Sequence, residues 1–155
     1  MDKIVLLISS VFGIGYIKYA SGTFASAAGV IIWFFIPSNY ETQAIIIIST
    51  IIISIITASI AERIYDNIDD GRIVIDEICG MWLTLFLLPK TPLFLIAGFF
   101  LFRLLDITKP LFINKLQGLK SGLGITADDV AAGIVGNLIL QGLNIAIIYN
   151  STGAI

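Results

Sequence analysis

The chain has 155 residues, a formal net charge of −2, 57% hydrophobic residues and only 13% charged residues. An ordinary soluble domain is about 45–50% apolar and about 25% charged, so a single domain of this length cannot bury so much apolar surface without lipid. This balance argues against intrinsic disorder, nucleic-acid binding and a secreted disulfide scaffold. The single cysteine, Cys79, permits no intrachain disulfide, and the absence of histidine removes every mechanism that needs an imidazole base or ligand.

Five apolar segments predict an all-α fold, a polytopic helical membrane bundle formed by one domain over residues 1–155. The longest segment, residues 44–61, holds 18 consecutive uncharged residues, which is enough for a helix to cross a bilayer. Pro37 ends the segment before it, and a turn that contains Pro89 and Pro92 separates the third segment from the fourth. The five predicted membrane helices cover residues 22–36, 44–61, 76–88, 93–107 and 128–149.

Two of the apolar stretches are short. Residues 4–17 are interrupted by Ser9, Ser10, Gly13 and Gly15 and lack a small-residue cleavage site, so we predict a retained short helix and not a signal peptide. Residues 76–88 would extend about 20 Å as a helix, against about 30 Å for the hydrocarbon core of a bilayer. We therefore expect polar groups at the start of this helix to lie below the level of the lipid headgroups.

The basic residues predict how the helices are oriented. If residues 18–23 are cytoplasmic and the five helices alternate, seven basic residues lie on the cytoplasmic side, and after Lys3 only Lys90 lies outside. This bias fixes the orientation by the positive-inside rule. The seven residues are Lys18, Arg63, Arg72, Arg103, Lys109, Lys115 and Lys120.

Acidic residues gather on the same predicted face, although the positive-inside rule does not require it. Those of the polar loop, Asp66, Asp69 and Asp70, are interpreted as solvated turn charges. Asp76 and Glu77 differ because they stand together at the start of an apolar helix. One acid there is explained as a helix cap, whereas a second acid is costly to desolvate unless it binds a ligand.

Two further acidic positions reach the same face from other helices. Asp106 lies three residues after Arg103, so the two side chains share a helix face and can simply pair. Asp128 and Asp129 are predicted at the positive end of the last helix, where capping is again an alternative. Carboxylates from three helices would repel one another, and a hard divalent cation with oxygen ligands would remove that repulsion. Without histidine or cysteine ligands the expected cation is Mg²⁺.

A divalent cation beside basic side chains suits phosphate chemistry, because the metal polarises a phosphoryl oxygen and lowers the pKa of a bound water. The guanidinium of Arg103 is suited to a phosphate because its planar fork can donate two hydrogen bonds. Lys109 and Lys18 are the other candidates for holding the phosphate. A phosphoenzyme formed on an aspartate remains an alternative to attack by water.

Four motifs in this order resemble the phosphatidylglycerophosphatase A family of small bacterial membrane enzymes. The second motif is similar to Asp-Glu-x-x-Gly-Met-Trp and the third to Phe-Arg-x-x-Asp-x-x-Lys-Pro. The first departs from the family pattern, with Ser21 in place of Pro and Ala25 in place of Gly. The motifs are Gly22-Thr23-Phe24-Ala25-Ser26, Ile75-Asp76-Glu77-Ile78-Cys79-Gly80-Met81-Trp82, Phe102-Arg103-Leu104-Leu105-Asp106 with Lys109-Pro110, and Gly122-Leu123-Gly124-Ile125 with Asp128-Asp129-Val130-Ala131-Ala132-Gly133.

The resemblance implies a Mg²⁺-dependent lipid phosphatase that converts phosphatidylglycerophosphate to phosphatidylglycerol and phosphate. It implies a multi-pass protein of the bacterial cytoplasmic (inner) membrane, here with its active site on the cytoplasmic face. Combined with the residue analysis, it gives a catalytic set, a metal set and a substrate-binding set. These are Asp76, Glu77, Asp106 and Asp129 for catalysis; the same four with Asp128 for Mg²⁺; and Arg103, Lys109, Thr23 and Ser26 for the substrate.

Two other functions are kept as alternatives. A CDP-alcohol phosphotransferase also uses aspartates and Mg²⁺, but here Asp69 is followed by Asp70 where that signature has Gly. A small transporter or channel subunit would use the polar stripe Asn137, Gln141 and Asn144 as a conduction path, whereas the simpler interpretation is interhelical hydrogen bonding. The spacings Ala25-x3-Gly29 and Ala132-x3-Gly136 predict close helix packing with either function.

Overall fold

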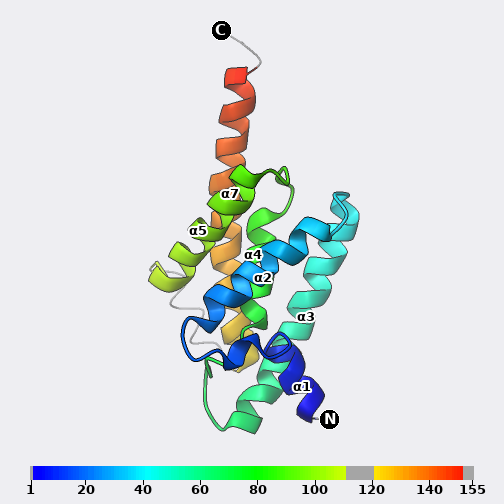
Figure 1. Ribbon diagram of the computed structural model, residues 1–155, viewed down its shortest axis with the longest axis vertical. Helices are drawn as coiled ribbons and strands as arrows, with labels where there is room; N and C mark the ends of the chain where they lie inside the picture. The colour runs from blue at the N-terminus through cyan, green and yellow to red at the C-terminus, as the bar shows by residue number, and fades with distance from the viewer. Residues whose placement is uncertain (1, 111–120, 152–155) are drawn as a thin grey trace.

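The computed structural model describes residues 2–110 and 121–151, and in this part of the chain every regular element is a helix (Figure 1). This confirms the all-α prediction. The predicted lysines Lys115 and Lys120 lie outside the described residues. The elements are α1 Asp2–Ser9, the 3₁₀ turn η1 Ile14–Tyr16, α2 Ser21–Phe35, α3 Tyr40–Tyr65, α4 Ile75–Leu85, α5 Pro92–Thr108 and α7 Gly122–Ser151.

Two of the described helices are long and apolar enough to cross a membrane, namely α3 with 26 residues and α7 with 30 residues. The prediction of five membrane helices is therefore supported only for these two. α2 has 15 residues, α4 has 11 and α5 has 17. At 1.5 Å per residue, α4 is only about 16 Å long, shorter than the segment 76–88 predicted from sequence.

The start of the last helix differs from the prediction. α7 begins at Gly122 and not at residue 128, so Asp128 and Asp129 lie in its second turn. They are therefore not helix caps. In α4, likewise, the N-cap residue is Val74, and no side chain caps that end of the helix. The N-cap explanation is thus wrong at both helices, although Asp76 and Glu77 do lie in the first turn of α4, where the helix dipole favours acids.

The N-terminal stretch forms a shorter helix than the predicted 4–17. α1 ends at Ser9, and the chain then turns through Val11 and Phe12, which have left-handed φ values of 48° and 54°. The Ser9 and Ser10 hydroxyls donate to carbonyl oxygens three residues earlier, which competes with continuation of the helix. The Ser9 carbonyl oxygen instead accepts a hydrogen bond of 2.9 Å from the Val74 amide, just before α4.

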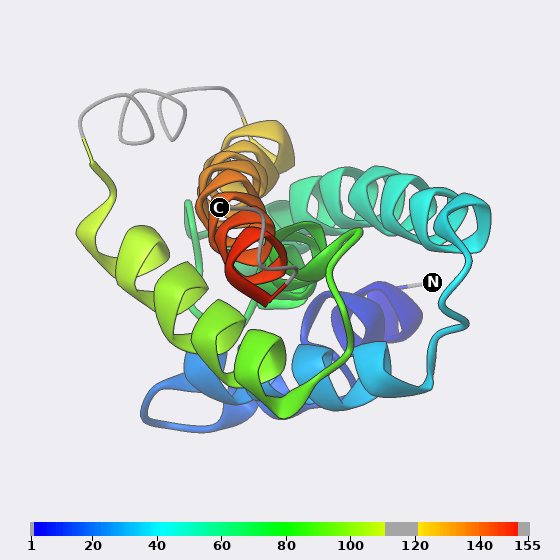
Figure 2. The ribbon, with the colours of Figure 1, turned by 90° about the horizontal axis from the view of Figure 1, so that it is seen from above.

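The short helix α4 lies in the middle of the bundle, where it contacts α2, α3, α5 and α7 (Figure 2). Its core-facing residues pack with Trp33 of α2 and Phe102 of α5, both fully buried. The last turns of α7 project beyond the other helices (Figure 1). Isoleucines there, such as Ile145 and Ile148, are more than half exposed, as expected of a surface that faces lipid.

Four helix ends meet at one end of this bundle: the starts of α2, α4 and α7, and the end of α5 (Figure 1). Pro110 disfavours helical backbone at the residue before it, and α5 ends at Thr108 with Lys109 in a left-handed conformation. The candidate residues predicted from sequence lie at these four ends.

Candidate active site

The distance between α4 and α7 is set by two glycines. A Cβ atom placed on Gly80 would lie 2.6 Å from the Asp129 carbonyl oxygen, and one on Gly133 would lie 2.5 Å from the Gly80 carbonyl oxygen. Larger residues would therefore force the two backbones apart. Gly80 follows Asp76 by one helical turn, and Gly133 follows Asp129 by one turn. The close crossing thus carries the two aspartates toward each other.

Three carboxylates meet beside this crossing. Asp76, Glu77 and Asp129 each offer one oxygen, and these oxygens lie within 4.8 Å of one another. The exposed fraction is 7% for Asp76 and 3% for Asp129, so little water screens their charges. We call these three residues the carboxylate group. Such a group is unfavourable unless protons or a cation neutralise it.

The carboxylate group also has unused hydrogen-bonding capacity. Asp76 Oδ1, Glu77 Oε2 and Asp129 Oδ2 are buried side-chain oxygens without a hydrogen-bond partner. Buried polar atoms are nearly always paired in proteins, so three orphaned oxygens at one place indicate a missing ligand. Oxygen donors without nitrogen or sulfur are the set that Mg²⁺ prefers. The residues therefore fit the cation expected from sequence.

The other two predicted metal ligands are occupied by cationic side chains. Arg103 Nη1 donates to Asp106 Oδ2 at 2.5 Å, the pair that the three-residue spacing allows. Lys109 Nζ forms an ion pair with Asp128 Oδ2. The structure thus places three of the five predicted ligands within reach of one ion, and Asp106 and Asp128 as partners of the cationic groups.

The first turns of α2 complete the surroundings of the carboxylate group. A Cβ atom on Gly22 would overlap the Glu77 carboxylate and lie 3.2 Å from Arg103 Nη1. Ser26, one turn later, is fully buried, and its Oγ lies 3.5 Å from the same guanidinium nitrogen. Thr23 is half-buried on the same helix start. Of the two substrate-binding residues predicted on α2, Ser26 therefore contacts the charged site directly.

Three glycines of the site were absent from the predicted set of site residues: Gly22, Gly80 and Gly133. Their signal in the sequence is spacing, because Gly80 and Gly133 each follow an acidic residue by four positions. An acid and a glycine at that spacing share one helix face. They therefore mark a face where a backbone and a ligand can both approach closely.

The comparisons with known proteins agree with this arrangement. The model of the phosphatidylglycerophosphatase A family matches residues 7–144. The chain belongs to this family. Members from two bacteria cover most of the chain, and they establish it as a phosphatase.

Three relatives of the phosphatase illustrate the range of the match. Phosphatidylglycerophosphatase A of Escherichia coli is 33% identical over 129 residues, covering 80% of this chain and 74% of the relative. The Haemophilus influenzae enzyme of the same name is 34% identical over 128 residues, covering 79% and 78%. A Bacteroides thetaiotaomicron protein provisionally named a phosphatidylinositol-3-phosphatase is 34% identical over 139 residues, covering 83% and 86%. No solved structure matches the chain at a significant level.

Of the three loop acids of the phosphatase, Asp66 and Asp69 are exposed, as expected of solvated turn charges, whereas Asp70 is not. Asp70 is 7% exposed and accepts hydrogen bonds from Arg72 Nε at 2.7 Å and Nη2 at 2.8 Å. These bonds hold the pKa of Asp70 well below its ordinary value. Glu62 accepts from Ser121 Oγ at 2.7 Å, and so ties the end of α3 to the start of α7. The interpretation of Asp70 as a solvated turn charge is therefore wrong.

Two residues of the polar stripe on α7 donate hydrogen bonds to carbonyl oxygens at the end of α4. Asn137 Nδ2 donates to the Phe86 carbonyl oxygen at 2.7 Å and to that of Thr84 at 3.1 Å, and Gln141 Nε2 donates to Phe86 at 3.2 Å. The last carbonyl groups of a helix need such partners where water cannot reach them. The interhelical interpretation is confirmed for these two residues, which leaves the conduction path without support there.

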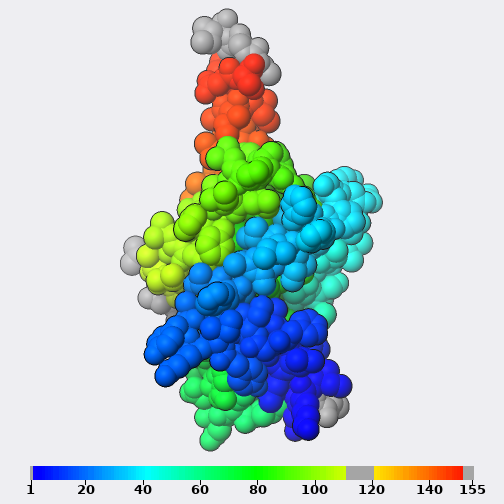
Figure 3. All heavy atoms as spheres, in the orientation of Figure 1, coloured from blue at the N-terminus to red at the C-terminus, as the bar shows by residue number. Residues whose placement is uncertain are grey.

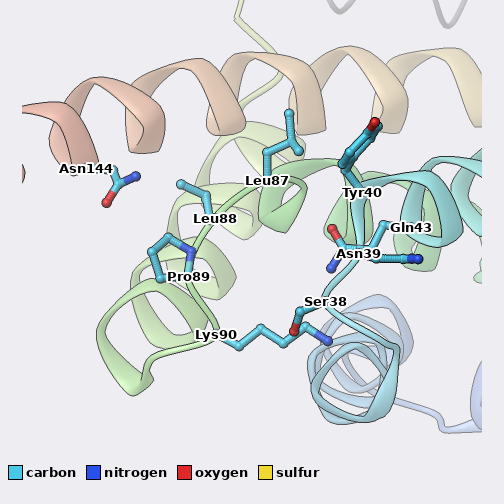
Figure 4. Close-up of a pocket in the computed structure, with 9 residues that line it drawn as sticks. All are labelled: Ser38, Asn39, Tyr40, Gln43, Leu87, Leu88, Pro89, Lys90 and Asn144. Carbon is cyan, nitrogen blue, oxygen red and sulfur yellow. The ribbon is translucent and has the colours of Figure 1, made fainter.

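A cavity of about 430 Å³ lies at the opposite end of the bundle, between the α2–α3 and α4–α5 loops (Figure 4). Asn144 and Lys90 are among its lining residues, and no carboxylate lines it. The Lys90 amino group donates to the carbonyl oxygens of Trp33 and Ile36, and therefore caps the end of α2. This cavity is remote from the chemistry of the phosphatase.

Proposed function

We propose that this protein hydrolyses phosphatidylglycerophosphate to phosphatidylglycerol and inorganic phosphate with Mg²⁺ as cofactor. The observation that carries the proposal is that hydrogen-bond acceptors and a hydrogen-bond donor, all without partners, lie in one buried site. The carboxylate group has three unpartnered oxygens, and the neighbouring Arg103 has an unpartnered donor, Nε. A cation together with a phosphate would satisfy both.

Asp76, Glu77 and Asp129 would hold the Mg²⁺ ion. When bound, the ion neutralises negative charge on the phosphoryl oxygens and on the departing oxygen. Asp106 and Asp128 would not bind the ion themselves and instead hold the two cationic side chains. Asp106 orients the Arg103 guanidinium, and Asp128 holds the Lys109 amino group in the same site.

Arg103 and Lys109 bind the terminal phosphomonoester of the lipid. The Nε donor of Arg103 is free for a phosphate oxygen, while its Nη1 stays on Asp106. Ser26 Oγ donates to the Gly22 carbonyl oxygen at 2.8 Å and lies beside the guanidinium. The start of α2 therefore limits how deeply the phosphate enters.

The reaction then needs one proton acceptor and one proton donor. A water attacks phosphorus opposite the glycerol oxygen, and one carboxylate of the group takes its proton as the new P–O bond forms. The bond from phosphorus to the glycerol oxygen breaks, and the proton that the carboxylate group took from the water passes to that oxygen as it leaves. The products are phosphatidylglycerol and phosphate, and the carboxylates return to their starting state.

We also propose that the site faces the cytoplasm in a bacterial inner membrane that the chain crosses several times. The four helix ends around the site carry Arg103 and Lys109, and the loops and helix ends at this end of the bundle carry Lys18, Arg63 and Arg72. Lys90 lies at the other end. This distribution is the one that the positive-inside rule associates with a cytoplasmic face.

The deciding experiment is phosphate release by the purified protein from phosphatidylglycerophosphate in mixed micelles. We expect turnover with Mg²⁺, loss of turnover with EDTA, and recovery when Mg²⁺ is restored. Phosphatidylinositol 3-phosphate serves as the second substrate, because one relative carries that name. Faster turnover of this lipid would reassign the headgroup, and full activity in EDTA would overturn the Mg²⁺ proposal.

A further inference from the structure

An apolar groove of about 240 Å³ runs between α2 and α5, on the face where the two helices lie next to each other (Figure 3). Several side chains of its rim are strongly exposed, for example Ile31 at 62% and Phe100 at 66%. Its floor includes Val30 and Phe99, which pack on the bundle core. The lining residues are Ala27, Val30 and Ile31 from α2 and Leu95, Ile96, Phe99 and Phe100 from α5.

One end of this groove adjoins the charged site. Ala27 directly follows Ser26, and Phe100 precedes Arg103 by three residues, which puts it on the same face of α5. Ser26 and Arg103 are themselves in contact across the two helices. Along α5 the groove is lined from Phe100 back to Leu95, about 8 Å of helix at 1.5 Å per residue.

We propose that this α2–α5 groove holds an acyl chain of the lipid whose phosphate is bound by Arg103. The inference rests on the proposed function and adds the route by which the lipid reaches the site. In such a lipid the headgroup glycerol and the phosphodiester separate the terminal phosphate at Arg103 from the tails, so the tails begin along the groove, beyond Ala27 and Phe100. The groove is the apolar surface that continues from the charged site in the direction of the tails.

The groove positions the lipid and does not concentrate it. Bulk lipid tails are as apolar as the groove, so no hydrophobic driving force favours one chain over another. The gain is orientation, because a chain held between two helices fixes the angle at which the phosphate meets the carboxylate group. Filling the groove should therefore lower kcat/KM for long-chain substrate without changing the binding of the protein to membranes.

Photocrosslinking tests the occupant directly. Phosphatidylglycerophosphate with a photoactivatable group midway along one acyl chain is reconstituted with the protein, and phosphatidylcholine with the same chain is the reference. We expect crosslinks from the first lipid to be enriched about fivefold in α2 and α5 over those from the second, as orientation by the headgroup requires. Equal labelling by the two lipids would overturn the groove assignment.

A filling variant gives the kinetic test. Ala27→Phe is compared with Ile48→Phe, which adds an aromatic ring to a lipid-facing position of α3 that is 58% exposed. We expect Ala27→Phe to lower the ratio of turnover of the long-chain substrate to turnover of the deacylated substrate about fivefold, while Ile48→Phe leaves the ratio unchanged. An unchanged ratio in Ala27→Phe would contradict the inference.

The two proposals fail in different ways. Enriched crosslinking without any phosphate release would support the groove and overturn the hydrolytic function. Phosphate release without enrichment would support the function and overturn the groove.

Discussion

The two ends of the bundle treat buried polar groups in opposite ways. At one end, Lys90, Asn137 and Gln141 donate to carbonyl groups that end α2 and α4, and only the Trp33 Nε1 donor among the described side chains there is buried without a partner. At the other end, oxygens of Asp76, Glu77 and Asp129 are buried without partners. Polar groups that are buried and satisfied stabilise a fold, whereas buried groups left unsatisfied are retained for a ligand. The difference distinguishes polar residues that stabilise the fold from polar residues that bind a ligand, although both kinds lie in apolar surroundings.

Neutralising the carboxylate group should have the largest effect. In Asp129→Asn and in Asp76→Asn, we expect phosphate release to fall at least about 100-fold, because a cation ligand or proton acceptor is lost. Thermal unfolding in detergent should show that both variants still fold, since removing one of three repelling charges relieves strain. Near-normal turnover in both variants would show that the carboxylate group is not the reaction centre.

Separating α4 from α7 should have the next largest effect. In Gly80→Ala, the added methyl group meets the Asp129 carbonyl oxygen and the Phe102 ring, so we expect a loss of about 1–3 kcal/mol of stability and reduced phosphate release. Gly142→Ala on α7 is the matched control, because a Cβ there meets nothing within 4 Å. That control should keep its activity and gain up to about 1 kcal/mol. Equal behaviour of the two variants would refute the role of the crossing.

At the opposite end, a variant should affect stability alone. Asn137→Leu leaves the carbonyl groups of Thr84 and Phe86 with fewer donors, so we expect a cost of about 1–3 kcal/mol. Activity per folded molecule should not change, because Asn137 lies more than two helical turns beyond Asp129 on α7. Detergent unfolding curves and phosphate release measured on the same sample provide the check. A loss of turnover at full stability would break the distinction between the two ends.

The smallest effect is expected at the loop before α4. Because the pKa of Asp70 is held below its ordinary value, its pairing with Arg72 stabilises the fold above pH about 4 and is lost as the pH falls further. Because the Arg72 side chain is 41% exposed, water screens the pair, and Asp70→Asn should cost about 1 kcal/mol at pH 7. The difference from wild type should shrink as the pH falls below about 4 in thermal unfolding experiments. A difference that grows at low pH would contradict this assignment.

The sequence predicted the helices well because apolar runs and prolines are local signals. It also predicted the members of the carboxylate group, since Asp76 and Glu77 are costly in an apolar context unless they bind a ligand. It did not predict which of the acids form the carboxylate group and which pair with basic side chains. Which carboxylate receives Arg103 or Lys109 depends on how helices pack, and that packing depends on where α7 begins.

The N-terminal stretch shows the same limit. Ser9 and Ser10 interrupt the apolar pattern of residues 4–17 without predicting where the helix ends. The end at Ser9 is coupled to a tertiary hydrogen bond from Val74, sixty-five positions further along the chain. Contacts of this kind have no local signature.

The fully buried residues between the two ends have a consequence for the membrane itself. Trp33, Met81, Leu85 and Phe102 form a dry layer that separates the carboxylate group from the cavity at the other end. Protons and ions that enter the charged site therefore meet an apolar barrier before they reach the far side. A membrane that contains the protein would therefore not leak protons or ions through this layer.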